Sequence, residues 1–109
     1  MTDTLAVIFG GPSDEHDISI LTGLQSSRIL SNKYNILNIY WTKDNKWYLV
    51  DQNLESIDFL DGDKILKKEL TIKYDSIPGF YLKRKKVEFN IAVNACHGGP
   101  GEDGTLQRF

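Results

Sequence analysis

The sequence predicts an α/β fold, an open and mainly parallel sheet flanked by helices, with a β-hairpin insertion. Two short runs, LAVIFGG and FNIAVNA, are apolar throughout instead of alternating, which is typical of strands buried on both faces. A helical pattern follows the first run, and β-rich arms surround a Pro-Gly pair in the second half. The order strand, helix, strand, hairpin, strand, helix favours a sheet whose central strands are parallel.

The first half contributes a strand, a helix and two further strands. LAVIFGG, residues 5–11, ends in two glycines, and PSDEHD then supplies helix-start residues in Ser13, Asp14 and Asp17. A helix is expected from Ile18 to about Leu30, where SNKYN interrupts the pattern. NILNIYW, residues 35–41, reads as the second strand. KDNKWYLV, residues 43–50, reads as a turn and a short third strand.

The second half is predicted to hold a hairpin, a strand and a helix start. Residues 51–68 are polar and read as loop with some helical turn. A hairpin is expected about Pro78-Gly79, because Pro presets φ and Gly accepts a positive φ. The lysines of LKRKK are expected on a solvated strand edge. FNIAVNA is a buried strand, and GEDGTLQRF, residues 101–109, reads as a helix start.

Composition limits the class of protein and its partners. With 109 residues, 40% hydrophobic and 26% charged, the chain is expected to be one soluble domain. A net charge of -2 offers no basic field for nucleic acid or anionic lipid. A single cysteine, Cys96, excludes an internal disulfide and fits a reducing compartment. No apolar run approaches a membrane span, so a cytoplasmic protein without nucleic-acid or membrane partners is expected.

Two polar turns follow the two buried strands, GGPSDEHD after the first and HGGPGEDG after the last. If both strands are central and parallel, Glu15 and His97 emerge at the same sheet edge, where ligands gather in such folds. The first turn lacks the spacings of phosphate-binding loops, and its carboxylate suits an ammonium group. Each residue also has a purely structural interpretation. Glu15 would then only interact favourably with the helix dipole, and His97 would only donate a hydrogen bond to a backbone carbonyl.

These turns also carry a family resemblance. VIFGGPSDEHDISILTG and HGGPGEDGTLQ resemble the N-terminal domain of the D-alanine–D-alanine ligases, members of the ATP-grasp superfamily. The second stretch matches the signature H-G-x-x-G-E-D-G, and the first matches G-G-x-S-x-E-x-x-[VI]-S. The resemblance implies a Rossmann-like domain over residues 1–109 that binds the first substrate. Arg108 departs from the pattern, which has a small residue after the glutamine, so local packing is expected to differ there.

The resemblance implies an ATP-dependent enzyme that joins two D-alanines for bacterial peptidoglycan. In it, Glu15 holds the ammonium group of the first D-alanine, Ile18 lines the pocket for its methyl group, and Ser19 supports the loop. His97 orients the same substrate, and with Glu15 it forms the expected catalytic pair. ATP and Mg²⁺ (or Mn²⁺) are expected on central and C-terminal domains outside this chain, which alone is expected to be inactive. A homodimer is also implied.

Two other functions stay open at this stage. Another ATP-grasp ligase, such as a D-Ala–D-lactate ligase, would share both motifs and differ in residues that meet the second substrate. A non-catalytic dimerisation module would keep the fold without using Glu15 and His97. Glu15→Gln and His97→Ala distinguish the two, because they should abolish activity of the complete protein only if the domain binds substrate.

Overall fold

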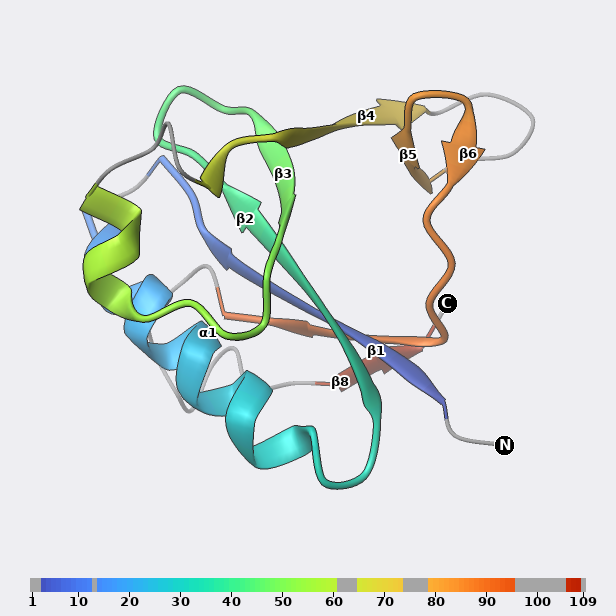
Figure 1. Ribbon diagram of the computed structural model, residues 1–109, viewed down its shortest axis with the longest axis horizontal. Coiled ribbons are helices and arrows are strands. Elements are labelled where there is room, and N and C mark those ends of the chain that lie inside the picture. Colours follow the sequence, from blue (N-terminus) through green and yellow to red (C-terminus); the bar gives the residue numbers. More distant parts are fainter. Residues whose placement is uncertain (1–2, 13, 61–64, 74–78, 96–105, 109) are drawn as a thin grey trace.

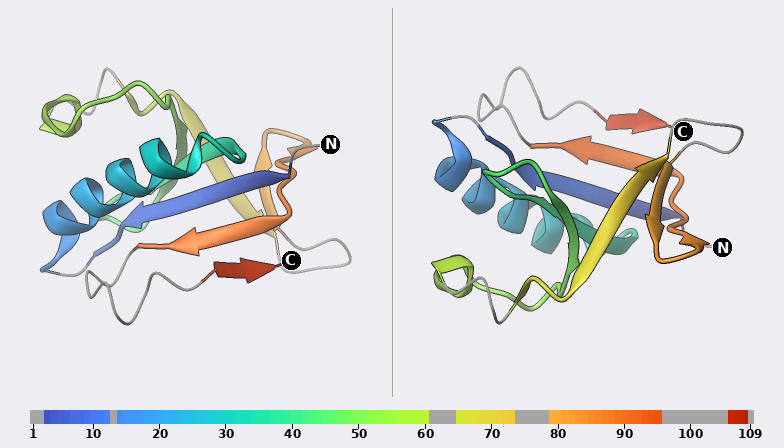
Figure 2. Two further views of the ribbon diagram at one scale, coloured as in Figure 1. Left: turned by 90° about the horizontal axis from the view of Figure 1, so that it is seen from below. Right: turned by 90° about the horizontal axis from the view of Figure 1, so that it is seen from above.

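The computed structural model describes residues 3–12, 14–60, 65–73, 79–95 and 106–108. Its strands form one eight-stranded sheet in the order β6-β5-β4-β3-β2-β1-β7-β8, with α1 lying along one face (Figures 1 and 2). The elements in chain order are β1 (Thr4–Gly10), α1 (His16–Leu30), β2 (Asn35–Trp41), β3 (Trp47–Val50), the 3₁₀ helix η1 (Ser56–Leu60), β4 (Lys68–Lys73), β5 (Gly79–Leu82), β6 (Lys85–Lys86), β7 (Ile91–Asn94) and β8 (Leu106–Arg108).

The α/β class is confirmed, and the centre of the sheet is parallel as predicted. β1 pairs in parallel with β2 on one side and with β7 on the other, so that Leu5 lies between Ile36 and Ile91. All other strand pairs are antiparallel, which makes the sheet as a whole mixed. The connection between β2 and β3, residues 42–46, shows why. It is far shorter than the crossover that parallel strands need.

The main core lies between the sheet and α1. Alternate residues of β1, Leu5, Val7 and Phe9, are fully buried and pack with Ile20 and Leu24 of the helix. Phe59 of η1 and Leu54 pack against the same cluster, so both described helices cover the same face. The prediction that helices flank the sheet is therefore confirmed for this face. Helix α1 begins at His16, two residues before the predicted start.

The opposite face of the sheet carries aromatic and aliphatic side chains. Ala6, Ile39 and Leu70 form its buried centre. Trp41 and Trp47 stack with ring centroids 4.6 Å apart and planes 8° apart, and Phe80 lies 5.2 Å from Trp47. β1 thus has apolar neighbours on both faces, as its uninterrupted apolar sequence predicts.

The middle of the chain follows the predictions within the described residues. Residues 51–60 are loop and 3₁₀ helix. β4 and β5 pair antiparallel, with Leu70 opposite Leu82, while Pro78 lies outside the described residues. β6 stands at one edge of the sheet with Lys85 exposed, which confirms the solvated lysine edge.

The predicted helix at the end of the chain is wrong where the structure describes it. Leu106–Arg108 form β8, which runs antiparallel to β7 with Leu106 opposite Val93 and Arg108 opposite Ile91. Without β8 the outer edge of β7 would leave backbone N–H and C=O groups unpaired, and three residues in extended conformation satisfy them. Long-range pairing thus decides this segment against its local helix-start pattern.

Candidate functional site

The carboxyl ends of β1 and β7 lie side by side, as the sequence predicts (Figure 2). Ile8 pairs with Asn94, and the N–H of Ala95 donates to the carbonyl of Ile8 at 2.8 Å. Ala95 is the last described residue before His97, which lies outside the described residues together with Cys96. The two strand ends therefore meet at one edge, and the approach of Glu15 to His97 stays a prediction.

Ser19 joins these strand ends to the helix. Its side chain is fully buried, and its Oγ accepts a hydrogen bond from the N–H of Gly10 at 2.8 Å. The same hydroxyl donates to the carbonyl of Ala95. One side chain of α1 thus holds the ends of β1 and β7 in fixed relation, which we call the Ser19 bridge. This position suits the loop-supporting role that the resemblance implies for Ser19.

Glu15 lies at the helix start and Ile18 one turn further along. Glu15 occupies the N-cap position with φ -94° and ψ 17°, is exposed, and its side chain makes no capping hydrogen bond. Its backbone carbonyl accepts from the N–H of Ser19 at 2.9 Å. Ile18 is 54% exposed, unusual for a large apolar side chain. Both side chains are therefore accessible to a ligand beside the glycine turn.

His16 is a buried member of the site that the sequence analysis does not identify. Its Nδ1 lies 2.5 Å from the carbonyl oxygen of Gly11, and its Nε2 lies 2.7 Å from the hydroxyl of Tyr40. A carbonyl only accepts, so Nδ1 carries the proton and donates. In the neutral ring Nε2 accepts from Tyr40. His16 stands four residues before Ile20, so extending the apolar helical face back by one turn would have found it.

The glycine turn is also bound to the end of β2. The N–H of Gly11 donates to the carbonyl of Trp41 at 2.7 Å. Gly10 and Gly11 both have φ +97°, and a Cβ on Gly10 would lie 2.3 Å from the Trp41 oxygen. Glycine is required at this contact for both reasons. Burial raises the pKa of the Tyr40 hydroxyl, and the negative charges of Asp17 and Asp44 raise it further.

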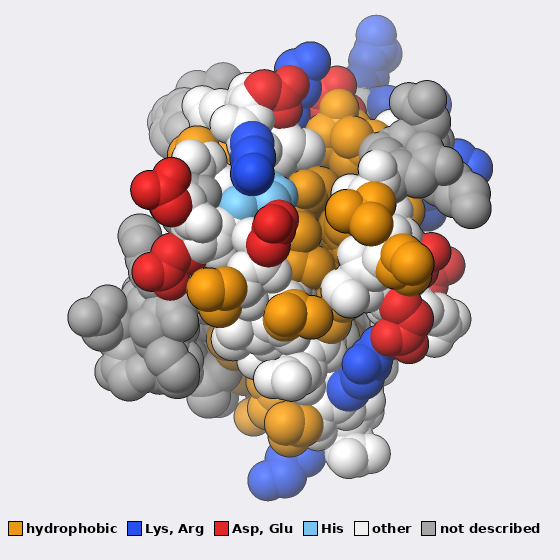
Figure 3. All heavy atoms as spheres, turned by 90° about the vertical axis from the view of Figure 1, so that its left-hand side faces the viewer, with side chains coloured by type: hydrophobic (Ala, Val, Ile, Leu, Met, Phe, Trp, Pro, Cys, Tyr) orange, Lys and Arg blue, Asp and Glu red, His pale blue; other side chains and the backbone are white. Residues whose placement is uncertain are grey.

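A hollow of about 580 Å³ lies beside this turn, between α1 and η1 (Figure 3). Ile20, Tyr40 and Phe59 contribute to its walls, with Asp17 and Lys43 as charged members of its lining. Nowhere in the described ranges do three or more His, Cys, Asp or Glu side chains group in a way that could hold a metal ion. The described helices also include none with the length and apolar character needed to cross a bilayer.

Comparison with known proteins decides the family. The family model described as D-ala D-ala ligase N-terminus matches residues 4–109. The chain belongs to this family. Both sequence motifs lie within the match, and the recognition made from the motifs is confirmed.

Individual members agree with this assignment. The chain is 36% identical over 107 residues to a D-alanine–D-alanine ligase from Sulfurovum sp. strain NBC37-1, covering 94% of this chain and 30% of that protein. The crystal structure of D-alanine-D-alanine ligase from Helicobacter pylori superposes with TM-score 0.71 at 29% identity, covering 95% of this chain and 32% of that one. The crystal structure of the VanG D-Ala:D-Ser ligase from Enterococcus faecalis superposes with TM-score 0.64 at 26% identity, covering 96% of this chain and 32% of that one. The chain thus spans about a third of the length of these relatives.

Proposed function

We propose that residues 1–109 form the N-terminal, first-substrate domain of a D-alanine–D-alanine ligase that acts in peptidoglycan synthesis in the bacterial cytoplasm. One observation carries the proposal: the carboxyl ends of β1 and β7, next to which the two family motifs lie in the sequence, adjoin and are joined by Ser19. The D-alanine–D-alanine ligases among the relatives support the reaction. The remaining two thirds of such a protein would supply the central and C-terminal domains.

In this proposal Glu15 binds the ammonium group of the first D-alanine. The carboxylate stands exposed at the start of α1, where its side chain is not used to cap the helix. A charge-assisted hydrogen bond of this kind contributes about 1.5–3 kcal/mol. Ile18, exposed one turn further on, provides an apolar surface for the methyl group. His97, two residues beyond Ala95, orients the substrate from the neighbouring strand end.

The Ser19 bridge gives this pair its precision. The two strand ends carry groups that must meet the same small molecule, and a small displacement between them would weaken both contacts. By bonding Gly10 and Ala95 together, Ser19 holds the two ends in register. Ser19 is accordingly a positioning residue beneath the substrate.

ATP and Mg²⁺ are expected to bind elsewhere in the full-length enzyme. The described residues offer no carboxylate cluster for the metal, and the GGPSDE turn carries an acidic pair where phosphate would need positive or neutral groups. These residues do not fit the nucleotide, so no step that involves ATP is assigned to them. A homodimer of the full-length enzyme is part of the same proposal.

A related ligase with a different second substrate is the alternative that a specific observation favours. The D-Ala:D-Ser ligase structure covers 96% of the chain at 26% identity. Such enzymes would share the first-substrate domain. Competition between D-alanine, D-serine and D-lactate as second substrate in the intact protein distinguishes them.

The proposal is tested by kinetics of the intact protein. Glu15→Gln removes the charge that binds the ammonium group, and we expect a higher KM for the first D-alanine and a lower kcat. His97→Ala should lower kcat as well. Gln25→Ala, exposed on the same helix, is the matched control and should behave as the parent protein. Thermal unfolding checks that each variant is folded. Normal activity in both site variants would reject the site and would mean that this domain serves the active protein in a non-catalytic role.

A further inference from the structure

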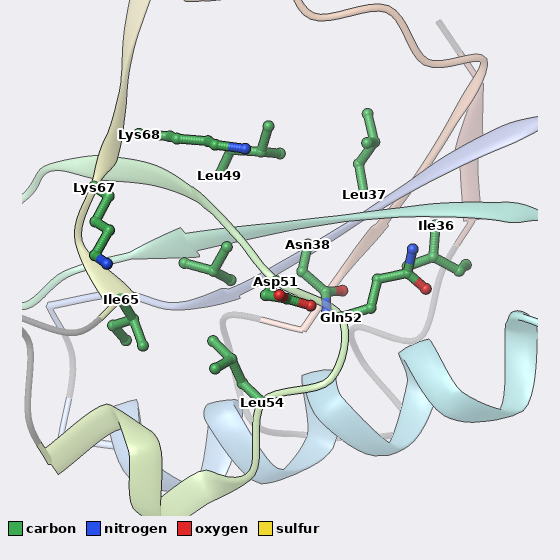
Figure 4. Close-up of a pocket in the computed structure, with 11 residues that line it drawn as sticks. Ile36, Leu37, Asn38, Leu49, Asp51, Gln52, Leu54, Ile65, Lys67 and Lys68 are labelled. Carbon is green, nitrogen blue, oxygen red and sulfur yellow. The ribbon is translucent and has the colours of Figure 1, made fainter.

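A second cavity lies on the sheet away from the candidate site, where β2 and β3 separate (Figure 4). The two strands pair only from Asn38, opposite Val50, to Trp41, opposite Trp47. Before Asn38, β2 pairs with β1 but not with β3, and the chain after Val50 leaves the sheet through Asp51 and Gln52. The cavity between these segments measures about 440 Å³. This volume falls in the range of about 300–1,000 Å³ that small-molecule sites occupy.

The buried amide of Asn38 is the unusual group of this cavity. The residue is 0% exposed, yet within the described part of the chain neither Oδ1 nor Nδ2 has a hydrogen-bond partner. Its neighbours on the same face of β2, Ile36 and Tyr40, belong to the apolar core. Figure 4 shows its side chain directed from β2 toward the Asp51–Gln52 segment. Buried polar groups are normally paired, so an unpaired donor and acceptor on a cavity wall indicate a missing partner.

Charges of both signs border the same cavity. Lys67, Lys68 and Asp51 are exposed and belong to its lining, as does Gln52. Asp51 Oδ1 accepts from the backbone N–H of Asn53 at 3.0 Å, and a carboxylate has further acceptor capacity. The remaining walls include the apolar side chains of Ile36, Val50, Leu54 and Ile65. This lining suits a small molecule with one positive end, one negative end and a short apolar part.

The strand edge adds a further recognition element. Residues 35–37 of β2 pair with β1 on one side, and no described strand pairs with them on the other. An exposed strand edge binds extended peptides through main-chain hydrogen bonds. The edge borders the cavity, because Ile36 and Leu37 belong to its lining.

We propose that this cavity is a binding site for a zwitterionic peptide of dipeptide size. The peptide group supplies the donor and acceptor that complement the Asn38 amide, the terminal carboxylate pairs with Lys67, and the terminal ammonium pairs with Asp51. A simple carboxylate or amine would satisfy one of these groups and leave Asn38 unpaired. The proposal is independent of the ligase activity, because it uses none of the residues at the ends of β1 and β7.

The test is a titration of the ¹⁵N-labelled intact protein with D-alanyl-D-alanine and with L-alanyl-L-alanine. The backbone amide resonances of Gln52 and Leu54, which line the cavity and are present in every variant, report binding there. We expect a saturable shift with at least one dipeptide and none with acetate. Asn38→Leu should weaken binding about threefold to tenfold, the loss of one or two neutral hydrogen bonds. Lys67→Ala should weaken it by a similar factor, and Lys46→Ala, exposed in the β2–β3 turn, should not.

Each outcome decides the proposal. The Lys67→Ala variant keeps the test valid if Asn38→Leu folds poorly, because Lys67 is exposed. Glu15→Gln, which impairs the proposed active site, should leave the dipeptide shift intact, so failure of the ligase proposal and failure of this one are distinguishable. Absence of a saturable shift with either dipeptide overturns the site. Equal binding of acetate overturns the peptide specificity. Unchanged dipeptide binding by a folded Asn38→Leu protein overturns the pairing of the peptide group with the Asn38 amide.

Discussion

At the scale of single residues, the site depends on buried polar side chains beneath the exposed ones. Ser19 and His16 are both buried in the first turns of α1, and each bonds the backbone of the glycine turn. Glu15 directly precedes His16 and Ile18 directly precedes Ser19, but both of these side chains are exposed. The alternation follows helical geometry, since neighbouring positions point 100° apart. A helix start can therefore hold a loop and present a ligand-binding carboxylate at once.

Replacing Ser19 tests this support. In Ser19→Ala the N–H of Gly10 and the carbonyl of Ala95 lose their partner while they remain buried. Unsatisfied buried groups cost about 1–3 kcal/mol each, so we expect the free energy of unfolding to fall by about 2–4 kcal/mol. Urea denaturation measures the change. Ser31→Ala removes an exposed hydroxyl bonded to Arg28 and should change stability little, and equal effects of the two substitutions would contradict the role of the bridge.

The Tyr40 hydroxyl gives stability a pH dependence at alkaline pH. Its pKa is raised in the folded protein, chiefly by burial, so the folded state retains the proton longer than the unfolded chain does. The resulting stability is fully present below the ordinary tyrosine pKa of about 10 and is lost as the pH rises through the folded-state pKa. Unfolding measured at a series of alkaline pH values should show this decline. In Tyr40→Phe the free energy of unfolding should fall less steeply with pH. An unchanged fall would contradict the role of the Tyr40 hydroxyl.

At the scale of elements, close packing of α1 on β1 fixes the helix above the sheet. A Cβ on Gly23 would lie 2.5 Å from both Cβ and Cγ of Phe9, which is closer than side chains can approach. Phe9 is itself fully buried, so it has little room to move. The absence of a side chain at Gly23 thus allows the helix to sit near the strand that ends in the candidate site.

Gly23→Ala is expected to destabilise the protein despite the better helix propensity of alanine. Overpacking in a filled core costs about 1–3 kcal/mol, which exceeds the gain of roughly 1 kcal/mol from replacing glycine in a helix. Thermal unfolding should therefore show a lower Tm. Adding Phe9→Leu provides space and should recover part of the loss. An increase in Tm for the single variant would mean that the helix can shift away from β1 without cost.

The elements that the sequence predicts correctly have strong local patterns. β1, β2, β3 and α1 combine apolar periodicity with glycine or polar ends, and each forms close to its predicted bounds. β8 and the antiparallel additions to the sheet depend on which distant strand has a free edge, a property absent from any local window. The hydrogen bonds of Ser19 cannot be predicted from a local window for the same reason, because its acceptor Ala95 lies far along the chain. The order of motifs predicts which strand ends meet, whereas the bonds that join them require the fold.

At the scale of the whole molecule, the proposed ligase would divide substrate binding and activation by ATP between different domains. The described strands and helices form a layered arrangement with its own core, and the candidate site lies at one end of the central strands. This site offers an acidic group for an ammonium ion. The described ranges contain no acidic cluster that would hold Mg²⁺. A domain of this kind can orient an amino acid without activating it.

The chain of 109 residues should therefore fail to turn over ATP by itself. In a coupled assay of ADP release with D-alanine and Mg²⁺ we expect no rate above background, because the proposal assigns the groups that neutralise phosphoryl charge to the other domains of the full-length protein. The intact protein, assayed under the same conditions, is the positive control, and its Glu15→Gln variant should fall between the two. Circular dichroism of the isolated chain establishes whether it is folded. Turnover by the folded chain at a rate near that of the intact protein would place the nucleotide site within these residues.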